Sequence, residues 1–179
     1  MIQQDKKLTL KSTTDAGWFS GYASVYECLD LHKDIVAKGA FTETLKGEEW
    51  PKMLWQHDPA HPIGRWEKIE ETEEGLYVEG RLFLEIEKAR EAFVLLCEGV
   101  LNGLSIGFQV EKSRRLSGGR LLEKVRLYEI SLVTFPANGN ARVLTVKNQD
   151  LCADLLEKVQ RLRESISRHC EEIRQDYCL

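Results

Sequence analysis

Residues 104–135 contain two long runs in which apolar and other side chains alternate, and a turn sequence separates them. In the first run Leu104, Ile106, Phe108 and Val110 alternate, which is the period of a half-buried strand. The second run extends from Arg120 to Phe135, and the intervening Ser117-Gly118-Gly119 suits a tight hairpin turn. These residues therefore predict a long antiparallel hairpin.

Shorter strand patterns precede and follow this hairpin. The strands expected there cover residues 8–11, 18–26, 52–57, 62–69, 76–84 and 142–146. Two helices are expected, a short one from Gly39 to Leu45 and a clearer one from Glu85 to Glu98. The second has an apolar stripe through Ala89 and Phe93, and Gly99 is a natural stop. The pattern predicts an α+β chain that is mainly β.

Composition narrows the class of protein. The chain has 179 residues, is 42% hydrophobic and carries a net charge of −4, so it can bury a sizeable core and nucleic acid is not expected as a partner. No apolar run is long enough to cross a membrane. The five cysteines form no C-x-x-C pair, so they are expected to be reduced thiols in a cytosol, with neither a disulfide framework nor a zinc site.

Asp30, His32 and Asp34 alternate along the chain, and one interpretation is that they bind a metal ion. The competing interpretation is a polar loop that enters a strand. No further ligand cluster supports the metal, so neither a metal nor a cofactor is expected.

The composition changes after residue 147. From Asp150 onward apolar residues recur at spacings of three and four, as in an amphipathic helix. Residues 1–147 are thus predicted to be the folded domain and 148–179 a helical tail. That tail is expected to dock on the domain, on a second copy of the chain or on a partner.

Ser105 lies between two nearby glycines in the stretch Asn102 to Phe108. Because Ser105 alternates with Leu104 and Ile106, its hydroxyl is predicted to point away from the core face, which is how a nucleophile is presented to a substrate. The alternative interpretation is an ordinary solvent-facing serine. The spacing also fits the G-x-S-x-G nucleophile elbow. That motif needs a helix after the serine and then a histidine, whereas more strand follows here and only His169, near the end of the tail, comes later.

Two further residues complete a possible nucleophilic set. His57 ends an apolar strand just before Asp58-Pro59, and Glu129 lies inside an apolar run, where a carboxylate needs a partner. A serine hydroxyl needs an imidazole to accept its proton, and the imidazole needs a group that fixes its tautomer. The alternatives are a hydrogen-bonded edge histidine and a cross-strand ion pair of Glu129 with Arg or Lys. His61 is a weaker candidate base.

Several blocks, in order between residues 18 and 146, resemble the prohead maturation protease family of tailed phages. They are GYASVY (21–26), LWQHD (54–58), PIG (62–64), GLYVEGRL (75–82), GLSIGF (103–108) and EISLVTFPAN (129–138). That family is similar in fold to the herpesvirus assemblins. The resemblance implies a closed antiparallel β-barrel ringed by helices, with Ser105 as nucleophile and His57 as base. Glu129 would stand where assemblins have a second histidine.

The resemblance also implies a function. A serine endopeptidase of this family works inside the prohead in the host bacterial cytoplasm. It cuts the scaffold or the N-terminal scaffolding segment of the major capsid protein, and often itself, and a homo-oligomer is expected. The backbone of the turn from Pro136 to Asn140 is the expected source of oxyanion donors. Two alternatives remain at this point: a scaffold-like capsid assembly protein that no longer cuts, and a generic esterase on a β-barrel.

Overall fold

The structure is a computed structural model that describes residues 17–47, 49–147, 160–161 and 163–168. Its elements follow the order β1 (Trp18–Val25), β2 (Asp34–Val36), α1 (Thr42–Leu45), β3 (Lys52–Trp55), β4 (Asp58–Glu71), β5 (Gly75–Leu82), α2 (Glu87–Cys97), β6 (Gly103–Leu116), β7 (Gly119–Val133) and β8 (Val143–Val146). The predicted long hairpin is confirmed as β6 and β7. The strand expected at 8–11 and most of the tail lie outside the described residues; 160–161 and 163–168 are helical.

All eight strands belong to one mainly antiparallel sheet in the order β2-β7-β3-β4-β5-β1-β8, with β6 paired to β7. β7 is long enough to have three partners. It pairs antiparallel with β6 along most of its length, and parallel with β2 at residues 120–122 and with β3 at residues 129–132. These two parallel pairings differ from the wholly antiparallel sheet expected from the sequence. They matter because the β3 pairing brings residues 52–57 beside the end of β7.

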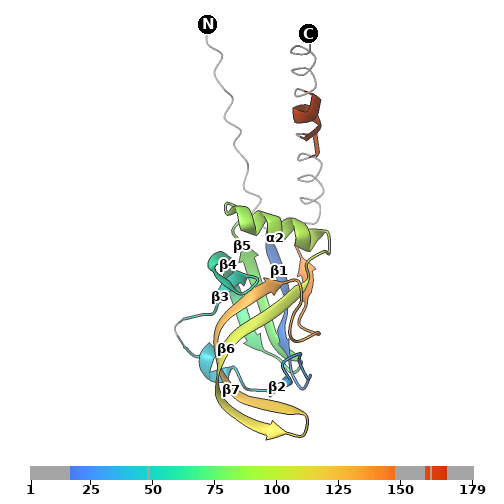
Figure 1. Cartoon of the computed structure of the whole chain (residues 1–179). Helices are drawn as coiled ribbons and strands as arrows, with labels where there is room; N and C mark the ends of the chain where they lie inside the picture. The colour runs from blue at the N-terminus through green and yellow to red at the C-terminus, as the bar shows by residue number, and fades with distance from the viewer. Residues whose placement is uncertain (1–16, 48, 148–159, 162, 169–179) are drawn as a thin grey trace.

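The sheet curls into a half-barrel (Figure 1). The start of β6 approaches the residue before β8 at an isolated bridge between Gly103 and Arg142. Two hydrogen bonds flank the bridge, from Leu104 N–H to Ala141 O at 3.1 Å and from Val143 N–H to Asn102 O at 2.8 Å. A single bridge replaces the continuous ladder that the expected closed barrel would have at this seam.

Helix α2 lies across one end of the curled sheet, and the β6–β7 hairpin extends away from the other end (Figure 1). The helix buries Ala89, Ala92, Phe93 and Leu96, which share one face because they are three and four residues apart. They join a core built from inward-facing strand residues such as Phe19, Val78 and Ile130. No helix in the described residues is long and apolar enough to span a membrane. Cys97 at the end of α2 is disulfide-bonded, so the expectation of reduced thiols throughout is wrong for this residue.

A β-bulge interrupts β7 and changes which residues face the core. Phe108 pairs with Leu127 but its neighbour Gly107 pairs with Glu129, so Tyr128 is an extra residue. The core contains Val125 and Leu127 before the bulge and Ile130 and Leu132 after it. Glu129 and Ser131 therefore leave the core face that a continuous alternation with Val125 and Leu127 would give them. Such bulges often lie next to active sites, where they redirect a side chain.

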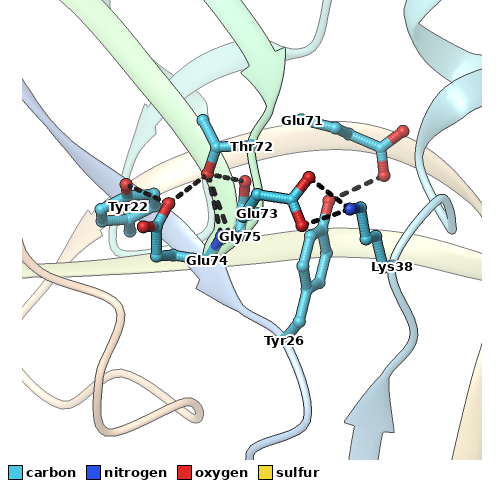
Figure 2. A network of polar contacts seen from close by, with 8 residues as sticks. All are labelled: Tyr22, Tyr26, Lys38, Glu71, Thr72, Glu73, Glu74 and Gly75. Atoms are coloured by element: carbon cyan, nitrogen blue, oxygen red, sulfur yellow. Dashed lines mark hydrogen bonds and ion pairs between the residues drawn. The ribbon is translucent and has the colours of Figure 1, made fainter.

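A polar network joins the end of β1 to the turn between β4 and β5 (Figure 2). Tyr22 donates to Glu74 at 3.2 Å, Tyr26 donates to Glu71 at 2.8 Å, and Lys38 pairs with Glu73. Burial and the neighbouring Glu71 carboxylate raise the pKa of the Tyr26 phenol. Glu71 also accepts the Phe41 N–H at 3.2 Å, next to the start of α1. These acidic residues thus anchor both the end of β1 and the segment between β2 and α1.

Candidate functional site

His57 lies in the two-residue turn that joins β3 to β4. Trp55 pairs with Asp58 across this turn, and Gln56 and His57 have φ angles of 52° and 62°. A two-residue hairpin with both φ angles positive is a type I′ turn, which favours Asn-Gly because other side chains are strained there. Strained turns without glycine persist only when their surroundings hold them, and they cluster at functional sites.

The end of β7 and Thr134, which follows it, supply the groups that hold this turn. Gln56 N–H donates to Leu132 O at 3.0 Å, and the Gln56 side-chain amide donates to Thr134 Oγ1 at 2.8 Å. The parallel pairing of β3 with β7 places Trp55 opposite Leu132, so the turn begins beside the end of β7. The fold thereby fixes the backbone from which the His57 imidazole extends.

Glu129 is the partner of that imidazole. Its Oε1 lies 2.6 Å from His57 Nδ1, and its side chain is only 13% exposed. The predicted need for a partner is met by a histidine, not by a cross-strand Arg or Lys. The hydrogen bond and, more weakly, the negative charge of Glu129 raise the pKa of His57, and burial of the ring opposes them. The pair matches the base and carboxylate of a serine hydrolase in its chemistry.

Gly107 gives the Glu129 carboxylate its space. The two residues are cross-strand partners, and a Cβ at position 107 would lie 2.1 Å from Glu129 Oε1. Real Cβ atoms essentially never show contacts that short, so any side chain here would displace the carboxylate. The second glycine of the stretch around Ser105 therefore serves the acid, which the sequence analysis did not anticipate.

Ser105 is on β6 and is 7% exposed, so it is not the solvent-facing serine of the alternative interpretation. It lines a cavity of about 370 Å³ together with His57. The rest of the wall mixes apolar and polar side chains, among them Ser24, His32, Ile106, Phe108, Phe135 and Asn138. No hydrogen bond joins the Ser105 and His57 side chains in the described part of the chain, and in substrate-free sites such bonds are often long.

Ser131 is a member of this cluster that the sequence analysis missed. It lies directly opposite Ser105 on β7 and is fully buried. Its hydroxyl donates to Glu129 Oε2 at 2.6 Å and accepts the His57 backbone N–H at 3.1 Å. The signal in the sequence was the spacing of two between Glu129 and Ser131, which puts both side chains on one face of a strand. A serine within an apolar strand has no distinctive pattern that marks it as part of a site.

The remaining candidates have other contacts. Both Asp34 oxygens bind Arg120, at 2.8 and 2.7 Å, and Asp30 Oδ1 accepts the backbone N–H groups of His32 and Asp34. These contacts fit the interpretation of a polar loop entering β2, and the described residues contain no cluster of three or more groups suited to a metal ion. His61 pairs with Asp58 at 2.8 Å and is not among the residues that line the cavity.

Comparison with solved structures supports the fold. The capsid assembly protease of bacteriophage T4 matches with a TM-score of 0.51 and 12% identity, over 65% of this chain and 82% of that one. The KSHV protease, solved with a hexapeptide phosphonate inhibitor, matches with a TM-score of 0.52 and 13% identity, over 80% of this chain and 76% of that one. At these identities the likeness concerns the fold alone, and it agrees with the predicted herpesvirus protease type.

Sequence comparison is more specific. The family described as caudovirus prohead serine protease matches residues 6–153. The prohead protease of Enterobacteria phage HK97 is 34% identical, over 88% of this chain and 73% of that protein. The capsid polyprotein of Pseudomonas phage PAJU2 is 32% identical, over 55% of this chain and 16% of the polyprotein. The chain therefore belongs to the caudovirus prohead serine protease family and is a serine protease of phage capsid maturation.

Proposed function

We propose that Ser105 is the nucleophile of this protease, His57 its general base and Glu129 the group that orients His57. The observation that carries the proposal is the 2.6 Å contact between His57 and Glu129 at the wall of the cavity that Ser105 also lines. These are the three groups that covalent hydrolysis of a peptide needs. They come from β6, the β3–β4 turn and β7.

The contact also favours one tautomer of His57. Glu129 accepts the proton on His57 Nδ1, which leaves Nε2 with a lone pair for the Ser105 hydroxyl. Ser105 Oγ attacks the scissile carbonyl as its proton moves to Nε2, and the carboxylate stabilises the imidazolium that forms. The imidazolium then gives this proton to the leaving amine as the peptide C–N bond breaks. Water, activated by the same imidazole, hydrolyses the acyl-enzyme and restores the serine.

The oxyanion donors are proposed within the turn from Pro136 to Asn140. Ala137 and Asn138 line the same cavity as Ser105. Asn138 Oδ1 accepts the Asn140 N–H at 3.1 Å, and Asn138 O accepts the Ala141 N–H at 2.9 Å. Because the Asn140 N–H has this partner and Gly139 does not line the cavity, the N–H groups of Ala137 and Asn138 are the better donors.

The proposed substrate is the scaffold or the N-terminal scaffolding segment of the major capsid protein, and also the chain itself. This chain is similar to part of a phage capsid polyprotein, and the similarity supports a link between the gene for the protease and the gene for the shell protein. Cleavage would take place inside the prohead, in the cytoplasm of the host bacterium. We further propose that residues 1–147 form the catalytic domain as a barrel closed at the Gly103–Arg142 bridge. Residues 148–179 would mediate self-association or docking to the shell.

Coexpression with the capsid protein tests the catalytic assignment. Ser105→Ala and His57→Ala should both leave the capsid protein at full length while the variants keep a cooperative melt. His61→Ala is the matched control, because His61 has a carboxylate partner but lies outside the cavity. Mature-length product with a folded Ser105→Ala variant would exclude Ser105 as nucleophile. If His61→Ala is inactive and His57→Ala is active, the base is His61 and not His57.

A further inference from the structure

We propose that Ser131 is a positioning residue that holds the His57 backbone and the Glu129 carboxylate in one geometry. This inference rests on the proposed roles of His57 and Glu129. The Ser131 hydroxyl uses both of its capacities, donating to Glu129 Oε2 at 2.6 Å and accepting the His57 N–H at 3.1 Å. Glu129 Oε1 closes the ring of contacts at His57 Nδ1. A single oxygen atom, Ser131 Oγ, thus connects the His57 backbone to the Glu129 carboxylate.

The need for such a support follows from the turn. His57 has a φ angle of 62°, in the left-handed region, where residues other than glycine are strained. Glu129 holds Nδ1 of the imidazole ring, and Leu132 O holds the Gln56 amide. The Ser131 hydroxyl holds the His57 amide itself. Without it, the amide can move, and the imidazole moves with the backbone that carries it.

Serine suits this position in size and chemistry. The site is fully buried on β7, opposite Ser105, so a larger side chain has little room. A hydroxyl can donate and accept at once, as the carboxylate and the amide require. Alanine would leave the part-buried His57 N–H and one Glu129 carboxylate oxygen without this partner, and polar groups that lose a hydrogen bond away from water favour rearrangement of the segment.

The chain contains a matched control in α1, which hydrogen-bonds to the same strand, β7. The Thr44 hydroxyl also forms two hydrogen bonds to β7, donating to Val125 O at 2.9 Å and accepting the Leu127 N–H at 3.1 Å. Among the described residues, neither Val125 nor Leu127 hydrogen-bonds to His57 or Glu129. Thr44→Ala therefore removes an equal number of hydrogen bonds from β7 and reports the effect of lost stability alone.

The experiment measures kcat and KM for cleavage of purified capsid protein, with thermal melts, for Ser131→Ala and Thr44→Ala. A displacement of about 1 Å in a catalytic group costs on the order of 100-fold in rate. We expect kcat to fall by roughly 10- to 100-fold in Ser131→Ala with KM little changed, and Thr44→Ala to keep its kcat despite a similar loss of melting temperature. Equal kcat values for the two variants would overturn the proposal.

A second pair of variants separates the hydroxyl from its volume. Ser131→Thr and Ser131→Val add similar bulk, and only threonine keeps the oxygen. A higher kcat for threonine than for valine supports positioning, and equal kcat values contradict it. If both fail to fold, the comparison of Ser131→Ala with Thr44→Ala decides alone. His57→Ala is assayed in parallel. If His57→Ala keeps its activity, the proposed base is refuted. If His57→Ala is inactive and Ser131→Ala is fully active, only the role of Ser131 is refuted.

Discussion

Replacement of Gly107 by alanine should inactivate the enzyme through Glu129 without unfolding it. The added Cβ would lie 2.1 Å from Glu129 Oε1, 2.8 Å from Cδ and 2.9 Å from Cγ. Ordinary van der Waals contact begins at 3.4 Å, so the carboxylate must retreat by about 1.3 Å. The backbone cannot take up this shift easily, because Gly107 and Glu129 are paired in the β6–β7 ladder.

Such a retreat removes the 2.6 Å contact with His57 Nδ1. The imidazole then loses both its fixed tautomer and the charge that stabilises its protonated form. A misplacement of this size costs on the order of 100-fold in kcat, about 2.7 kcal/mol of transition-state stabilisation. The backbone itself should tolerate the change, because alanine in a strand is favoured over glycine by roughly 0.5–1 kcal/mol.

The assay is a double-mutant cycle on the cleavage rate of purified capsid protein, with thermal melts of every variant. Gly107→Ala should reduce kcat strongly in the native background and have little further effect in a Glu129→Ala background, because it acts through that carboxylate. Two results would refute the reasoning: a kcat of Gly107→Ala close to that of the unsubstituted chain, or an equal fold-loss in both backgrounds.

Three further predictions follow from the site and the core. His57 must be neutral to accept a proton, so activity should rise with pH through a His57 pKa above the ordinary ~6.5. Glu129→Gln removes the main cause of that raised pKa. In this variant the acidic limb of the pH–rate profile should therefore move to lower pH, and the maximal rate should fall. Phe135 lines the cavity yet is 87% exposed, so Phe135→Ala should raise KM more than it lowers kcat; an unchanged KM would remove it from the substrate path. Tyr26→Phe deletes the hydrogen bond to Glu71 and should lower stability by ~1 kcal/mol in a denaturant titration, with unchanged cleavage.

Local patterns in the sequence were sufficient for most elements of the domain. Alternation and the glycine pair predicted β6 and β7, and the spacing of Ala89, Phe93 and Leu96 predicted α2, since these signals act between near neighbours. His57 lies two residues past the end of β3, in the turn to β4 and not within the strand expected at 52–57, whereas Glu129 was correctly expected to need a partner. Burial of a carboxylate in an apolar run makes that requirement visible in one sequence.

The geometry that unites the site was not predictable, because it depends on non-local pairing. The parallel contact of β3 with β7 brings His57 to Glu129, and nothing near residue 52 or 129 encodes it. The turn at Gln56 and His57 has none of the Asn or Gly residues that announce a type I′ turn. The bulge at Tyr128, which redirects Glu129 and Ser131, likewise appears only once the register with β6 is known.

The central claim is that Ser105 attacks the peptide, and the position of a covalent adduct tests it most directly. The chain would be treated with diisopropyl fluorophosphate, a reagent for activated serines, and the modified residue located by peptide mass spectrometry. We predict one adduct, on Ser105, whose formation is lost in His57→Ala and strongly slowed in Glu129→Gln. An adduct on another serine that blocks capsid protein cleavage while Ser105 stays unmodified would contradict the assignment.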